Sequence, residues 1–183
     1  RQMCIRDRLI CTHAKRDRCC AVKGRPLLNA LHERYPFGPS NDVVWETSHI
    51  KGHRFAPTML LLPWAYSFGR MNLEATDAML AAATDGLYFV PGNRGRGTLG
   101  PAEQAAELAV AAQVPGARYG QFDVVAGEGD SDLAATVTDT ASGQKYEVQL
   151  EQRPISGVVD SCGKAPKEST AWVAVSVAPV ERN

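Results

Sequence analysis

The order of predicted secondary-structure elements limits most strongly how this chain can fold. Short apolar runs bounded by turn-forming residues predict strands at 8–11 and 43–49, and the segment 24–35 between them has the apolar spacing of a helix. An interrupted apolar run at 58–71 predicts a pair of strands. Strands that alternate with helices in this way pack as layered α/β structures.

Two further helices and a strand are predicted after this pair. The segment 72–86 is expected to form a helix with Asn72 as its N-cap, and 101–113 is expected to form another. The apolar run at 87–90 predicts a short strand, followed by a loop at 91–100. The fold class that fits this order is α/β, a thioredoxin-like sandwich in which helices flank a central mixed sheet.

The C-terminal part of the sequence has a different pattern. Val, Thr and Gly alternate with charged residues in LAATVTDTASGQKYEVQLEQ, which predicts a hairpin turned at Ser142-Gly143, and TAWVAVSVAPV predicts a further strand. We therefore expect a thioredoxin-like domain at 9–116 and a β-rich extension at 117–183. Residues 1–8 resemble a translated sequencing adapter and are interpreted as an artefact.

Composition excludes several classes of protein. Twenty basic and twenty acidic residues leave no net charge, which argues against a general nucleic-acid-binding or membrane-surface protein. No apolar run reaches the roughly 18 residues of a membrane span, and the beginning lacks the apolar core of a signal peptide. A cytoplasmic location is therefore expected. Five cysteines form a poor disulfide framework and suit thiols used for metal or redox work.

Soft ligands are concentrated in two predicted loops. CTHAKRDRCC follows the first strand and carries Cys11, Cys19 and Cys20, while HIKGH follows the second strand and carries His49 and His53. In a thioredoxin-like sheet both loops leave at the same end. Two thiolates and two imidazoles can then face each other.

The spacing of these residues discriminates among metal centres. Structural zinc sites take two cysteines separated by about two to four residues, whereas eight residues separate Cys11 from Cys20, so mononuclear zinc is disfavoured but stays open. A Rieske centre needs a cysteine in both of its motifs, and the second loop has none. A 2Fe-2S cluster fits better, with Cys11 and Cys20 on one iron and His49 and His53 on the other. Replacing thiolate by imidazole should raise its potential above that of a plant-type ferredoxin.

Three segments together resemble the sucrase/ferredoxin-like family: CTHAKRDRCCAVKGRPL, VWETSHIKGHRFAPTMLLLP and NRGRGTLGPAEQAAE. The resemblance is dense over residues 9–113 and implies a thioredoxin-like ferredoxin with a bis-histidinyl 2Fe-2S cluster, here as an N-terminally truncated fragment. It implies four cluster ligands, namely Cys11, Cys20, His49 and His53. The doubled cysteine departs from the family's pattern, so Cys19 is the alternative to Cys20.

The expected function is electron transfer, with this chain as an electron carrier rather than an enzyme and a protein as its redox partner. One alternative is a metal-free thiol-disulfide redox protein that uses the Cys11, Cys19 and Cys20 loop, although no C-x-x-C pair is present. Another is a zinc-stabilised binding module. No nucleic-acid or membrane partner is expected, and the oligomeric state is left open.

Other residues near the predicted ligands have less specific interpretations. Arg16, Arg18 and Arg54 form either a solvated face or groups that dock an acidic electron partner. His13 is expected to orient its loop. The segment 95–100 satisfies G-x-G-x-x-G, but four residues separate it from the preceding predicted strand, so we interpret it as a structural loop rather than a dinucleotide site.

Overall fold

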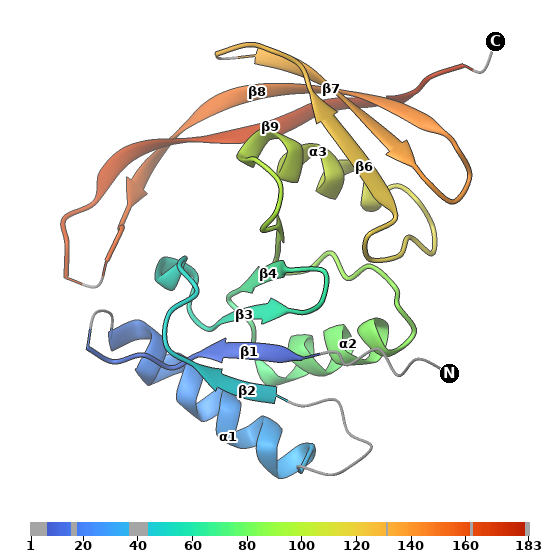
Figure 1. Cartoon of the computed structure of the whole chain (residues 1–183). Helices are drawn as coiled ribbons and strands as arrows, with labels where there is room; N and C mark the ends of the chain where they lie inside the picture. Colours follow the sequence, from blue (N-terminus) through green and yellow to red (C-terminus); the bar gives the residue numbers. More distant parts are fainter. Residues whose placement is uncertain (1–6, 16–17, 37–43, 131, 162, 182–183) are drawn as a thin grey trace.

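The described residues form two β-sheets, the first packed against two α-helices and the second against one (Figure 1). The structure is a computed structural model that describes residues 7–15, 18–36, 44–130, 132–161 and 163–181. No helix in the described part of the chain is long and apolar enough to cross a membrane.

The first sheet carries the two predicted loops. Its strands are β1 (Arg8–Cys11), β2 (Val44–Thr47), β3 (Thr58–Leu61), β4 (Tyr66–Gly69) and β5 (Asn93–Arg96). They lie in the order β2-β1-β3-β4-β5. β1 runs parallel to β2 and antiparallel to β3, and β4 runs antiparallel to both of its neighbours. The predicted fold class, a mixed sheet of thioredoxin-like type, is confirmed.

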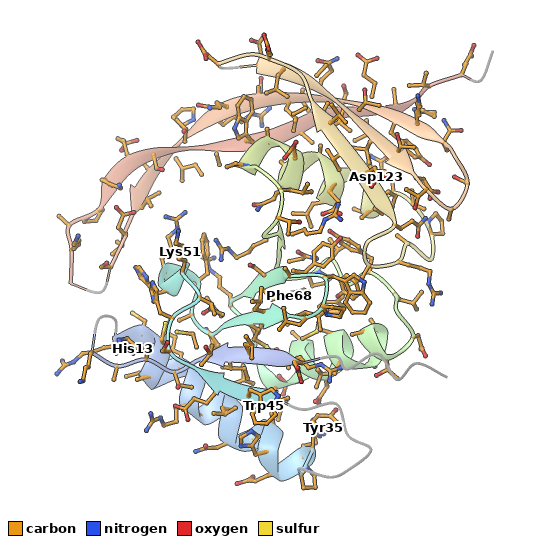
Figure 2. All side chains as sticks on the ribbon, in the orientation of Figure 1. His13, Tyr35, Trp45, Lys51, Phe68 and Asp123 are labelled. Atoms are coloured by element: carbon orange, nitrogen blue, oxygen red, sulfur yellow. The ribbon has the colours of Figure 1, made fainter. Side chains whose placement is uncertain are left out.

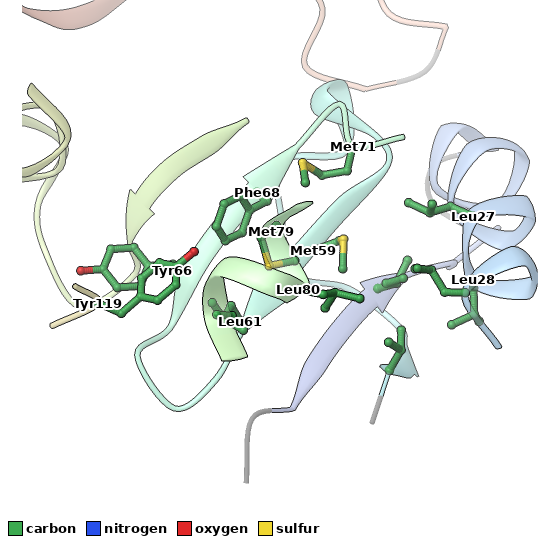
Figure 3. Packing of buried hydrophobic residues seen from close by; sticks show 14 residues of the cluster. Leu27, Leu28, Met59, Leu61, Tyr66, Phe68, Met71, Met79, Leu80 and Tyr119 are labelled. Carbon is green, nitrogen blue, oxygen red and sulfur yellow. The ribbon is translucent and has the colours of Figure 1, made fainter. Parts of the chain in front are cut away.

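Two helices pack on one face of this sheet. They are α1 (Arg25–Arg34), which continues the short π-helix η1 (Cys20–Gly24), and α2 (Leu73–Thr84). Figure 3 shows their apolar side chains meeting those of the strands in one buried cluster. The Asn72 side chain accepts a hydrogen bond of 2.8 Å from the Ala75 amide and so caps α2 as predicted. The periodicity and the caps therefore locate both helices correctly.

The second sheet is antiparallel throughout and packs on α3 (Pro101–Ala111). Its strands, in spatial order, are β6 (Phe122–Ala126), β7 (Asp132–Asp139), β8 (Lys145–Val158) and β9 (Lys167–Pro179). The buried face of α3 lies in a cluster with the apolar side chains of this sheet. The predicted hairpin and last strand are confirmed. The predicted domain boundary at 116/117 stays a prediction. α3 lies before that boundary in the sequence but packs against the second sheet.

The strand predicted at 87–90 is wrong. Leu87 makes a single bridge with Arg118, and the fifth strand is β5, inside the segment predicted to be a loop. Phe89 instead donates its amide to the Tyr119 hydroxyl at 3.2 Å, and the Tyr88 ring packs against Tyr119. An apolar run can be a strand or a buried irregular segment, and its composition alone does not separate them.

The beginning of the described chain is part of the first sheet. Arg8 begins β1 and exposes 2 % of its surface. Asp7 Oδ1 accepts a hydrogen bond of 3.0 Å from Trp45 Nε1. The interpretation of residues 1–8 as an artefact stays a prediction. The last two of these residues, Asp7 and Arg8, contact the rest of the fold.

A buried polar network connects the two sheets. The Tyr66 hydroxyl, on β4, donates to Glu107 Oε1 of α3 at 2.7 Å. Arg96 Nη2, on β5, lies 3.0 Å from the same oxygen and donates to the Phe122 carbonyl at 2.7 Å. Burial raises the pKa of Glu107, while the Tyr66 hydrogen bond and the Arg96 charge oppose that rise. Two residues of the first sheet thus share one solvent-shielded acid on α3, the helix that packs against the second sheet.

Candidate metal centre

Two predicted ligands, Cys11 and Cys20, lie in one small buried cluster at the carboxyl end of β1. Cys11 ends β1, Cys20 begins η1, and each exposes 1 % of its surface. They pack together with Ala56, and we call these three residues the cysteine cluster. Neither cysteine forms a disulfide. Cys11 Sγ donates to the Ser48 carbonyl at 3.1 Å, directly before His49 in the chain.

Gly24 allows the first helix to approach Cys11 closely. A Cβ atom at this position would lie 2.3 Å from the Cys11 carbonyl oxygen. A backbone atom cannot yield as a flexible side chain can, so any larger residue would displace either the helix or the end of β1. Glycine at position 24 therefore sets the separation between the two segments that carry Cys11 and Cys20.

The two predicted histidine ligands lie on a tight turn that runs from the end of β2 into the 3₁₀ helix η2 (His53–Phe55). We call the segment 49–54 the histidine turn. Lys51 and Gly52 both have left-handed backbone conformations, with φ of 61° and 71°. The rings of His49 and His53 are 6.3 Å apart between centroids, with planes at 25°. His49 is exposed, whereas both ring nitrogens of His53 are buried. Ile50, within this turn, packs against the cysteine cluster.

The structure brings these residues together as two neighbouring pairs. Among the described residues no group of three or more His, Cys, Asp or Glu side chains could hold a single metal ion. A binuclear cluster differs from a mononuclear site, because each of its irons needs only two protein ligands. The two thiols of the cysteine cluster and the imidazoles of His49 and His53 supply donors of that chemistry. The Cys11–Ser48 hydrogen bond links the two pairs.

The other residues singled out near this centre have different surroundings. Cys19 packs against the cysteine cluster but is disulfide-bonded, unlike Cys11 and Cys20. His13 lines a separate cleft of about 440 Å³ at the ends of β1 and β2. Arg18 is exposed, and Arg16 lies outside the described residues. The structure thus separates His13 from the pair of histidines.

Three arginines gather around the ring of Phe55, which follows the histidine turn. The guanidinium carbons of Arg54, Arg70 and Arg94 lie 4.8, 5.7 and 4.4 Å from the ring centroid. We call these three the arginine cluster. Burial and then the charge of Arg54 lower the pKa of Arg94. Sequence reasoning singled out Arg54 but missed Arg70 and Arg94, which are distant in sequence.

The tip of the β8–β9 hairpin curves back toward the histidine turn (Figure 1). A cleft of about 500 Å³ separates them and is lined by five residues of the histidine turn together with Asp160, Ser161 and Lys164. Arg54 Nη1 lies 3.6 Å from Asp160 Oδ1 across it. We call this space the histidine cleft. The second sheet therefore reaches the candidate centre, which the sequence analysis did not predict.

Comparison with known proteins finds a family match in the N-terminal half of the chain, which contains the candidate centre. Residues 5–94 match the sequence pattern of the sucrase/ferredoxin-like family. This segment belongs to the sucrase/ferredoxin-like family. It contains all four predicted ligands and ends within β5, so α3 and the second sheet lie beyond the matched segment.

Other comparisons are more distant. No curated protein matches the chain. A cysteine-to-serine variant of the thioredoxin-like 2Fe-2S ferredoxin from Aquifex aeolicus is a solved structure with 17% sequence identity and a TM-score of 0.37. The alignment covers 44% of this chain and 88% of that chain.

Proposed function

We propose that this chain is an electron-transfer protein that holds one 2Fe-2S cluster through Cys11, Cys20, His49 and His53. The observation that carries the proposal is the presence of two buried cysteines without a disulfide and two stacked imidazoles in a segment that matches the sucrase/ferredoxin-like family. Thiolate and imidazole are both established ligands of 2Fe-2S clusters. When bound, such a cluster accepts and releases one electron.

The two ligand pairs differ in exposure, and this difference supports an electron carrier. The thiols of Cys11 and Cys20 are shielded, which protects thiolate ligands from oxidation. His49, by contrast, is exposed. An exposed ligand lets a partner approach closely, so we propose that electrons enter and leave on the histidine side.

The charges around the histidine pair also support this function. The arginine cluster places positive charge beside His53, through Arg54 and Arg94. Positive charge stabilises a centre that becomes more negative when it is reduced. Together with imidazole ligation, it should hold the reduction potential above that of an all-thiolate plant-type ferredoxin. We further propose a protein as the redox partner and retain the cytoplasm as the location.

The metal content of the full chain tests this function. After anaerobic reconstitution with iron and sulfide, we expect two irons and two acid-labile sulfides per chain, and a rhombic EPR signal after reduction with dithionite. A colourless protein that contains one zinc ion instead would favour the zinc-stabilised module and contradict the proposal.

The disulfide at Cys19 is a specific observation in favour of the alternative function, a metal-free thiol-disulfide redox protein. The burial of Cys11 and Cys20 opposes it, because an attacking thiolate needs access to its substrate. Catalytic turnover of a disulfide substrate by the metal-free chain would support the alternative. We expect no turnover.

A further inference from the structure

The histidine cleft is lined by more positive than negative groups. Lys51 and Arg54 face it from the histidine turn, and Lys164 faces it from the hairpin tip, against the single carboxylate of Asp160. Figure 2 shows Lys51 on the side of its loop that faces the hairpin. Because two separate parts of the chain contribute these cations, the cleft concentrates charge that neither part carries alone.

Asp160 compensates only part of this charge. It forms ion pairs with both Arg54 and Lys167. Its pKa is lowered, first by the hydrogen bond from Lys167 and then by the positive charges of Lys167, Arg54 and Lys164. Within the described part of the chain, no ion pair involves Lys51 or Lys164. Two ammonium groups that line the cleft therefore form no close ion pair within the described residues, although Lys164 still interacts with Asp160 through its charge.

The arginine cluster adds to the positive charge behind the cleft. A Cβ atom on Gly52 would lie 2.3 Å from Arg94 Nη1, so this guanidinium packs directly against the backbone of the turn. Neither Arg94 nor Arg70 has a carboxylate partner among the described residues. Holding like charges this close is unfavourable unless a counter-charge is near.

We propose that the histidine cleft binds an oxyanion, meaning the carboxylate or phosphate group of a ligand. A planar or tetrahedral oxyanion suits the ammonium groups of Lys51 and Lys164 and the guanidinium of Arg54. Its binding would bridge the histidine turn and the β8–β9 hairpin, and would place the ligand beside His49. This site goes beyond the proposed function, because anion binding here requires no cluster.

The test measures binding of two probes to the full chain by isothermal titration calorimetry at low ionic strength. The probes are inorganic phosphate, for a small free anion, and hexaglutamate, for the acidic side chains of a partner protein. We expect the double variant Lys51→Gln/Lys164→Gln to weaken binding by at least about tenfold, because it removes two of the three cations. Asp160→Asn should strengthen binding several-fold, because it removes the competing carboxylate.

A matched control separates a specific site from general attraction. The double variant Lys23→Gln/Lys145→Gln makes the same change in net charge with two exposed lysines that do not line the cleft. It should change binding less than twofold. Equal weakening by both double variants, or no binding of either probe, would overturn the proposal.

The two probes also identify the source of the oxyanion. Phosphate binding that matches or exceeds hexaglutamate binding supports a small free anion, whereas much tighter hexaglutamate binding supports acidic side chains of a protein. Iron and sulfide are assayed on the same samples. A protein that holds the cluster and binds neither probe overturns this inference alone and leaves the proposed function intact.

Discussion

Replacing Cys20 by serine is expected to abolish the cluster, whereas replacing Cys19 by serine is expected to leave its absorption spectrum nearly intact. Cys20 forms no disulfide and packs beside Cys11, whereas Cys19 is disulfide-bonded. A serine hydroxyl is a much harder ligand than a thiolate and binds iron-sulfur clusters poorly. The measurement is the visible absorption and the iron content per chain after identical reconstitution.

The two adjacent substitutions serve as controls for each other. Each exchanges one sulfur for one oxygen in neighbouring positions, and Cys19→Ser also removes a disulfide. Loss of the cluster in Cys20→Ser with its retention in Cys19→Ser therefore reflects ligation rather than general damage. Far-ultraviolet circular dichroism of both variants checks that the helices have formed. Retention of the cluster in Cys20→Ser together with its loss in Cys19→Ser would assign the second thiolate to Cys19.

Glu107→Ala is expected to lower the free energy of unfolding by about 3–5 kcal/mol. The substitution leaves the Arg96 guanidinium and the Tyr66 hydroxyl buried without the acceptor that they share. Domains of this size are stable by only about 5–15 kcal/mol, so the variant should be close to unfolding. Urea denaturation followed by circular dichroism measures the change.

Tyr66→Phe is the matched variant for the same network. It removes the hydrogen bond to Glu107 and a longer one from the Gly120 amide, but it keeps the Arg96–Glu107 ion pair, so its cost should be about 1–2 kcal/mol. The Tyr66 ring packs against Tyr88 and Tyr119, and phenylalanine preserves these contacts. A cost below about 1 kcal/mol for Glu107→Ala would show that the acid does not stabilise the junction of the two sheets.

Local sequence signals were sufficient for most elements of the fold. The N-cap at Asn72 and the apolar spacing in 24–35 and 101–113 predicted all three α-helices, because helix formation depends on residues close in sequence. The strand predicted at 87–90 is wrong because these residues pack against residues that are distant in the sequence. Tyr88 and Phe89 find partners around Tyr119, thirty residues further on, and β5 forms instead beside β4.

The surroundings of the candidate centre were less predictable than its residues. The cysteines and histidines stand out in two short motifs, and the structure packs the two cysteines together and the two histidines side by side. Arg70, Arg94 and Asp160 carry no motif of their own and reach Phe55 or Arg54 only through the pairing of distant strands. Such contacts depend on tertiary packing, which a single sequence does not reveal. The assignment of the four ligands stays a prediction.

The Mössbauer spectrum of the reconstituted chain, enriched in the Mössbauer-active isotope of iron, tests the central claim most directly. If Cys11 and Cys20 bind one iron and His49 and His53 bind the other, the oxidised protein will show two quadrupole doublets of equal area with different isomer shifts, because nitrogen ligands replace sulfur on one iron only. A single doublet from two equivalent irons would contradict this account, as would the absence of bound iron.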